Sequence, residues 1–211
     1  MTQYLKLVAF VAMFAAPLFA YEYPLSDTAI RKAYFLGAAR NRDTQEFLAQ
    51  YTHVLPMPKS GPHVAEITLD TPYARIVQYS TTARNFSAVD AVAKFLNAPA
   101  MVRVRVRIDL TASYTSIISS DAKGAHLRPD DFWRDFKVKF MQDGTEFPAQ
   151  RVKGEPIYFG SSPDGGGSTL SGAIVWLDYP ARHVASNTAT VEVLTPDGQH
   201  VRSDFDLRRL R

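Results

Sequence analysis

The sequence of 211 residues contains no cysteine. This absence excludes disulfide bonds, thiolate metal sites and cysteine nucleophiles, so the fold must be stabilised by packing, largely of its 13 Phe and 10 Tyr residues. An excess of charge of one sign is also lacking, because 24 Lys and Arg stand against 21 Asp and Glu, a net charge of +3. This small surplus predicts no polyanionic partner by itself, and we do not expect nucleic acid as a ligand.

Long hydrophobic runs are lacking except near the start of the chain. Residues 1–6 are mostly polar with one lysine, and the uncharged apolar stretch from Leu7 to Ala20 follows. As a helix it reaches roughly 21 Å, short of the roughly 30 Å hydrocarbon core of a bilayer. The pattern is typical of a secretory signal peptide, and we expect cleavage after Ala20. The alternative is an uncleaved N-terminal anchor. We expect an exported protein, periplasmic or extracellular, with no transmembrane span after cleavage.

Residues 21–62 are predicted to form a helical pair and a proline-rich connector. Ser26 offers a helix cap, Ile30, Ala33 and Tyr34 recur on one face, and a second short helix opens at Asp43 within the range 26–53. Residues 55–62 contain three prolines, which fix the backbone and remove hydrogen-bond donors. This segment is therefore expected to be a stiff connector.

Residues 63–211 are predicted to form a β-sandwich with one inserted helix at 87–97, capped by Ser87. The clearest strand is 102–110, where apolar and charged residues alternate. Asp143-Gly144 and Asp197-Gly198 are strong turn signals for two hairpins. The strands expected from these patterns are 64–69, 75–79, 102–110, 136–141, 146–152, 157–159, 173–179, 190–194 and 200–207.

The fold class expected from this order is α+β, an antiparallel β-sandwich of immunoglobulin-like proportions with the short helices on its N-terminal side. Such a chain forms one domain or a tightly docked pair. The glycine- and serine-rich segment 160–168 is expected to be a flexible connection between strands.

A row of arginines is the first candidate binding site. Arg103, Arg105 and Arg107 alternate along the strand 102–110, so that their guanidinium groups share one face and could bind phosphate or carboxylate groups. Lys137 and Lys139 are expected to extend this basic face. The alternative is a solvated face whose arginines pair with acids such as Asp178 or Glu192 on a neighbouring strand.

A cluster of potential metal or acid–base groups is the second candidate. His126 precedes Asp130, Asp131 and Asp135, and imidazole with carboxylates could hold a divalent cation or act on a glycan. The spacing matches no defined motif. Pro129 and the two aspartates after it also fit the first turn of a helix, with Phe132 and Trp133 as core residues. We therefore expect neither a bound metal nor a cofactor.

No catalytic constellation emerges from the motifs, which weighs against an enzyme. The sequence favours a non-catalytic envelope or extracellular binding module, whose partner is an anionic envelope polymer or another envelope protein. The alternatives are a structural or assembly protein of the cell envelope and a hydrolase acting on envelope polymers.

Overall fold

The computed structural model describes residues 21–121, 124–160 and 168–211. The expected signal peptide at 1–20 and residues 161–167 of the expected glycine-rich connection lie outside the described residues. Within the described part, the chain forms four α-helices and eleven strands, and every strand pairing is antiparallel. None of the described helices is long and apolar enough to cross a membrane. The expected mixture of helices and antiparallel sheets is confirmed.

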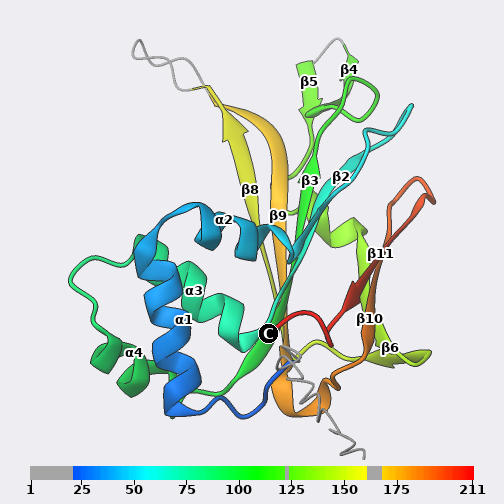
Figure 1. The fold of residues 1–211 in the computed structure, drawn as a ribbon. Coiled ribbons are helices and arrows are strands. Elements are labelled where there is room, and N and C mark those ends of the chain that lie inside the picture. The colour runs from blue at the N-terminus through cyan, green and yellow to red at the C-terminus, as the bar shows by residue number, and fades with distance from the viewer. Residues whose placement is uncertain (1–20, 122–123, 161–167) are drawn as a thin grey trace, which may run out of the picture.

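Four short helices gather beside the sheets (Figure 1). Ser26 caps the first helix, and Ser87 caps the fourth through a reciprocal capping box with Asp90. The second helix starts earlier than expected, because the side chain of Asn41 accepts a hydrogen bond from the backbone of Thr44. The helices are α1 (Asp27–Ala39), α2 (Arg42–Ala49), α3 (Pro72–Thr82) and α4 (Ala88–Phe95).

The larger sheet has five strands in the order β1-β2-β3-β9-β8. The expected strand at 102–110 is its central strand, paired with β2 on one side and β9 on the other. The pairing places Arg103 between Asp70 and Asp178. The five strands are β1 (Thr52–Val54), β2 (His63–Asp70), β3 (Met101–Asp109), β9 (Thr169–Pro180) and β8 (Arg151–Phe159).

The second sheet has four strands in the order β11-β10-β6-β7, and both expected hairpins lie in it. Gly144 and Gly198 have positive φ in the two turns, as the Asp-Gly signals require. A separate hairpin of β4 (Ile117–Asp121) and β5 (Gly124–Leu127) projects at one end of the molecule (Figure 1). The strands of the second sheet are β6 (Lys137–Gln142), β7 (Thr145–Phe147), β10 (Thr188–Leu194) and β11 (His200–Asp206).

Two hydrophobic clusters hold these layers together. The larger cluster combines Val104 and Val106 of β3 with Phe140, Val191 and Phe205 of the four-stranded sheet, so the core lies between the two sheets. The smaller cluster lies among the helices and is formed by residues such as Ile30, Ala33, Tyr73, Ile76 and Val77. The helices lie on the side of the five-stranded sheet that faces away from the four-stranded sheet (Figure 1).

The expected strand at 75–79 is wrong, because this segment belongs to helix α3. Thr71 caps the helix by accepting a hydrogen bond from the backbone of Ala74 at 3.2 Å. Pro72 occupies the first helical turn, where its missing N–H costs nothing. Tyr73, Ile76, Val77 and Ser80 then recur at helical spacing and are buried. Five residues are too few to distinguish the two-residue period of a strand from the 3.6-residue period of a helix.

The expected strand at 146–152 is also wrong, because it divides into the end of β7 and the start of β8. Pro148 lies between the two strands and lacks a backbone donor, which interrupts a sheet ladder. The chain crosses here from the four-stranded to the five-stranded sheet. The segment 157–159 is the end of β8 rather than a separate strand, and residues 52–54 form β1 rather than the end of a helix.

The contact between α1 and α3 depends on Gly37. A Cβ atom built on Gly37 would lie 2.3 Å from the carbonyl oxygen of Val77, which belongs to the backbone of α3 and has little freedom to move. The close approach of the two helices therefore requires glycine at this position, and it positions α3 against the sheet.

We predict that Gly37→Ala lowers the free energy of unfolding by about 1–3 kcal/mol through overpacking. Helix propensity alone predicts the opposite effect, because alanine in place of glycine inside a helix raises the free energy of unfolding by about 1 kcal/mol. Urea unfolding of both proteins measures the difference. The exposed neighbour Ala38 provides the matched control, since Ala38→Gly should lose only the propensity of about 1 kcal/mol. A Gly37→Ala variant more stable than the native protein would contradict the packing argument.

Candidate functional site

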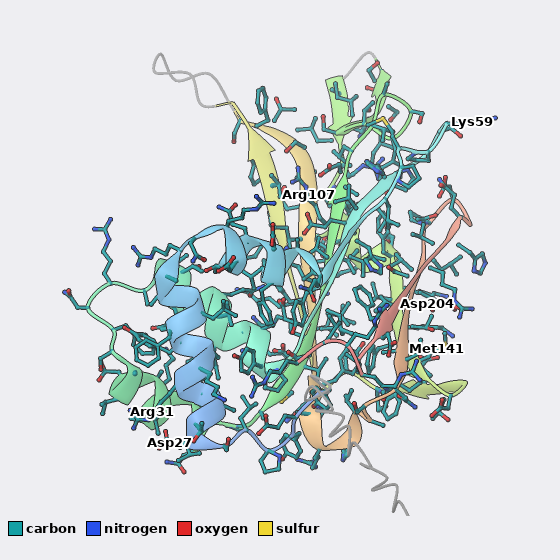
Figure 2. The ribbon with its side chains drawn as sticks, in the orientation of Figure 1. Asp27, Arg31, Lys59, Arg107, Met141 and Asp204 are labelled. Atoms are coloured by element: carbon teal, nitrogen blue, oxygen red, sulfur yellow. The ribbon has the colours of Figure 1, made fainter. Side chains whose placement is uncertain are left out.

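The three arginines of β3 lie on the face of the five-stranded sheet that points away from the other sheet. Val102, Val104 and Val106 alternate with them and are fully buried in the core between the sheets. In Figure 2, Arg107 lies on the side of the helices, whereas Met141 and Asp204 lie on the side of the four-stranded sheet. The structure therefore brings the arginines together on one face, as the alternation predicts.

Each of these arginines has a carboxylate partner. Arg103 binds Asp178 of β9 through two hydrogen bonds of 2.6 and 3.0 Å, and this pairing raises the pKa of Arg103. Arg105 donates to Glu66 at 2.6 Å, and Arg107 donates to its own-strand neighbour Asp109 at 2.9 Å. Much of the positive charge of the row is thus neutralised. Of the two acids named from the sequence, Asp178 is a partner, whereas Glu192 lies opposite Lys139 on the other sheet.

The two lysines that were expected to extend the basic face lie elsewhere. Lys137 and Lys139 belong to β6 of the four-stranded sheet, while the arginines belong to β3 of the five-stranded sheet. Lys139 pairs with Glu146 across the hairpin at 3.0 Å, and both side chains are about half exposed. The structure does not bring the five basic residues together, because the sequence pattern alone does not say which strands share a sheet.

The groups of the second candidate are also dispersed. The Nε2 atom of His126 lies 3.1 Å from a carboxylate oxygen of Asp121, and Asp131 pairs with Arg134 at 3.3 Å. Among residues 21–121, 124–160 and 168–211, no group of three or more His, Asp or Glu side chains could hold a metal ion. Phe132 is buried in the core and begins a short 3₁₀ helix, Phe132–Asp135.

A hollow of about 500 Å³ lies where α3 and α4 meet the outer face of the five-stranded sheet. We call it the cationic hollow, because three of its wall residues are Arg75, Lys94 and Arg103. The only carboxyl group among its wall residues is that of Asp70. The remaining lining residues are Gln78, Tyr79, Thr82 and Phe95.

The start of α3 places one face of the helix in this hollow. Asp70 ends β2, Thr71 caps the helix, and the first turn follows at once. Arg75, Gln78, Tyr79 and Thr82 then follow at i, i+3, i+4 and i+7, which is one face of a helix. The opposite face of α3 is packed among the helices.

Asp70 is a buried carboxyl group in the wall of the cationic hollow, with 3% of its surface exposed. Burial raises its pKa, an effect that the nearby guanidinium of Arg105 and a hydrogen bond from Gln78 at 2.7 Å oppose. Arg103 and Arg75 oppose the rise as well. The carboxylate at the end of β2 is therefore surrounded by donors and cations that belong to two other elements, β3 and α3.

Arg75 retains donors that have no hydrogen-bond partner among the described residues. Its pKa is lowered by burial and then by the nearby charge of Arg103. Its only hydrogen-bond partner among the described residues is the carbonyl oxygen of Met101, 3.4 Å from Nη1. A guanidinium group has five N–H donors in a planar fork, so this half-buried arginine can still bind a planar anion.

Lys94 completes the positive wall from α4. Its Nζ atom lies 3.9 Å from the centre of the Tyr79 ring, a cation–π contact that holds the ammonium group beside the hollow. The sequence did not single out Lys94 or Arg75 as site residues. The usable signal was Thr71-Pro72 as a helix start, which places Arg75 one turn later; nothing in the sequence indicated that Lys94 lies beside it.

Exposed apolar side chains lie on two other elements, the β4–β5 hairpin and β8. Ile117, Ile118 and Leu127 on the β4–β5 hairpin are more than half exposed, and Phe159 at the end of β8 is 79% exposed.

Two comparisons with known proteins were made for this chain. No protein-family model matches it, and no curated protein is similar to it. The arrangement of its side chains therefore carries the functional argument.

We predict unequal losses of stability from two members of the arginine row. Arg103→Gln leaves Asp178, whose side chain is 10% exposed, without its partner and should cost about 3 kcal/mol of unfolding free energy. Arg107→Gln breaks an ion pair whose arginine is 50% exposed and should cost at most about 1 kcal/mol. Urea unfolding measures both values, and equal losses would refute the structural role of the Arg103–Asp178 pair.

Proposed function

We propose that the mature chain is an exported, non-catalytic binding module that holds an anionic ligand in the cationic hollow. The observation that carries the proposal is the convergence of Arg75, Lys94 and Arg103 on one hollow with Asp70 as the only acid in its wall. The lining groups therefore carry a surplus of positive charge. The volume of the cationic hollow, about 500 Å³, is within the range of roughly 300–1,000 Å³ that small-ligand sites occupy.

The chemistry of the wall residues favours binding over catalysis. Guanidinium and ammonium groups are permanently charged at neutral pH, and the amide of Gln78 is fixed by its hydrogen bond to Asp70. These groups orient and neutralise an anion, and Arg75 supplies a planar fork that matches a carboxylate or phosphate. An anionic envelope polymer with acidic groups, or an envelope protein with an acidic segment, is a partner of this kind.

The two sheets and their covering helices suit such a module. A sandwich of immunoglobulin-like proportions is a rigid support, and the hollow lies at the junction of that support with α3 and α4. The alternative is a structural or assembly protein that self-associates through exposed apolar side chains such as Phe159. Such a protein would show an average molecular mass in solution that rises with protein concentration.

Export is part of the proposal. Its support is the apolar pattern of residues 1–20 together with the position of Tyr21, the residue after the expected cleavage site. The backbone N–H of Tyr21 donates to the carbonyl oxygen of Leu207, and its hydroxyl donates to that of Ala181, both at 2.9 Å. An N-terminus at Tyr21 can make the same hydrogen bonds.

We predict that Arg75→Gln and Asp70→Asn change anion binding in opposite directions. Loss of the Arg75 charge should weaken the binding of acetate and inorganic phosphate about tenfold, whereas loss of the Asp70 charge removes repulsion and should strengthen it. Chemical-shift titration by NMR measures both affinities.

Arg202→Gln provides the matched control, because Arg202 lies on the four-stranded sheet and pairs with Asp204. It should leave anion binding unchanged. The proposal fails if Arg75→Gln and Arg202→Gln have the same effect, or if neither anion shifts resonances at the hollow.

For export, we predict that the protein recovered outside the cytoplasm has the mass of residues 21–211. Intact-mass spectrometry after expression of the full sequence measures this. Ala20→Asp should block processing, because the cleavage site requires a small residue at this position. Recovery of the full-length mass from the native sequence would contradict cleavage after Ala20.

A further inference from the structure

We infer that the ligand of the cationic hollow is an amphiphilic monocarboxylic acid, whose hydrocarbon part lies in an adjoining apolar pocket. The inference rests on the proposed function, because it places the acidic group of the ligand at Arg75. It goes further by naming the second half of the ligand and a second binding surface.

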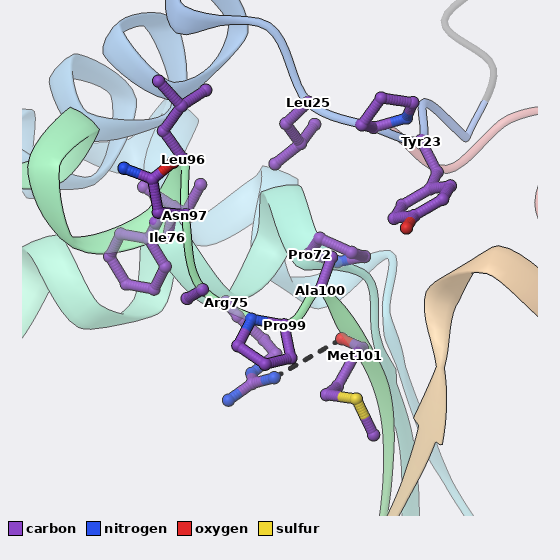
Figure 3. A pocket seen from close by; sticks show the side chains of 13 residues that line it. Tyr23, Leu25, Pro72, Arg75, Ile76, Leu96, Asn97, Pro99, Ala100 and Met101 are labelled. Atoms are coloured by element: carbon purple, nitrogen blue, oxygen red, sulfur yellow. Dashed lines mark hydrogen bonds between the residues drawn. The ribbon is translucent and has the colours of Figure 1, made fainter.

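The apolar pocket has a volume of about 340 Å³ and lies between α3, α4 and the chain that leads into α1. Figure 3 shows Leu25 and Leu96 among the side chains that line it, together with Ile76, Pro99 and Met101. Hydrocarbon side chains of this kind favour an apolar occupant, since burying one methylene group contributes about 0.8 kcal/mol.

The apolar pocket adjoins the cationic hollow. Arg75 and Phe95 line both, so these two side chains form a wall that the two spaces share. The aliphatic stem of Arg75 can cover hydrocarbon while its guanidinium group faces an anion. The hydrogen bond from Arg75 to the carbonyl oxygen of Met101, drawn as a dashed line in Figure 3, holds the side chain at this junction. A ligand that extends across this shared wall would place its acidic head beside the guanidinium group and its apolar tail in the pocket.

The charge of the site favours a head group with a single negative charge. When Asp70 is ionised, the wall of the cationic hollow contributes three positive charges and one negative charge. Asp178 is bound to Arg103 by two hydrogen bonds and cancels one further charge. The remaining charge is +1, which one carboxylate neutralises, whereas a phosphate monoester carries about −1.5 to −2 at neutral pH.

The test is a chain-length series of linear acids, butanoate, hexanoate and octanoate, titrated by calorimetry and NMR. We expect the affinity to rise about threefold to fourfold for each added methylene group. Arg75→Gln should weaken all three acids by a similar factor of about ten. Leu96→Ser should flatten the dependence on chain length while leaving butanoate unchanged.

Leu96 is 47% exposed, so its replacement should not unfold the protein. Leu127→Ser is the matched control, because Leu127 is a 68% exposed leucine on the separate β4–β5 hairpin. It should leave the whole series unchanged.

The outcomes separate this inference from the proposed function. If all three acids bind at Arg75 with equal affinity, the inference of an amphiphilic ligand is wrong, while the proposed anion site stands. If none of the acids binds, both the inference and the proposed function are wrong. Octanol that binds as tightly as octanoate overturns the role of the acidic head. Octyl phosphate that binds more tightly than octanoate overturns the carboxylate.

Discussion

The alternation along β3 is the constraint on which the rest of the structure depends. This strand is paired on both sides, by β2 and by β9, and its valines fill the core between the sheets. Its arginines must then lie on the opposite face. A shift of one residue would place three guanidinium groups in the core, so the register is strongly specified.

The register in turn determines where charges meet. It places Arg103 between Asp70 on β2 and Asp178 on β9. The guanidinium group of Arg103 donates to Asp178 and not to the buried Asp70. Asp70 instead accepts a hydrogen bond from Gln78 and is stabilised as an anion by the nearby charges of Arg105, Arg75 and Arg103. Because α3 begins directly after Asp70, the helix adds Arg75 and Gln78 to a group that the sheet alone would leave incomplete. The cationic hollow is thus a consequence of one strand register and one helix start.

The arginine row and the cationic hollow differ in what they offer a ligand. Glu66 and Asp109 bind Arg105 and Arg107 within the sheet, so an incoming anion would have to compete with an existing carboxylate. Arg75 has only a carbonyl oxygen as partner among the described residues, and that hydrogen bond is long. The energetics therefore favour recognition at Arg75, because an anion that binds to its donors without partners among the described residues breaks no ion pair.

The sequence by itself determined the elements whose signals are local. The period of two along 102–110, the Asp-Gly turns and the Ser87 cap each predicted the observed element, since backbone sterics and nearest-neighbour hydrogen bonds decide them. The sequence also placed Asp178 among the expected partners of the arginines. The sequence pattern predicted a strand at 75–79, which belongs to helix α3, because five residues are compatible with both the strand period and the helix period.

Only the tertiary structure decided which elements lie side by side. It separated Lys137 and Lys139 from the arginines by assigning β6 to the other sheet, and it joined Arg75, Lys94 and Arg103 from three elements. The physical reason is that sheet order and helix docking follow from the burial of apolar area over the whole chain, whereas a motif or a period reports only the preference of adjacent residues.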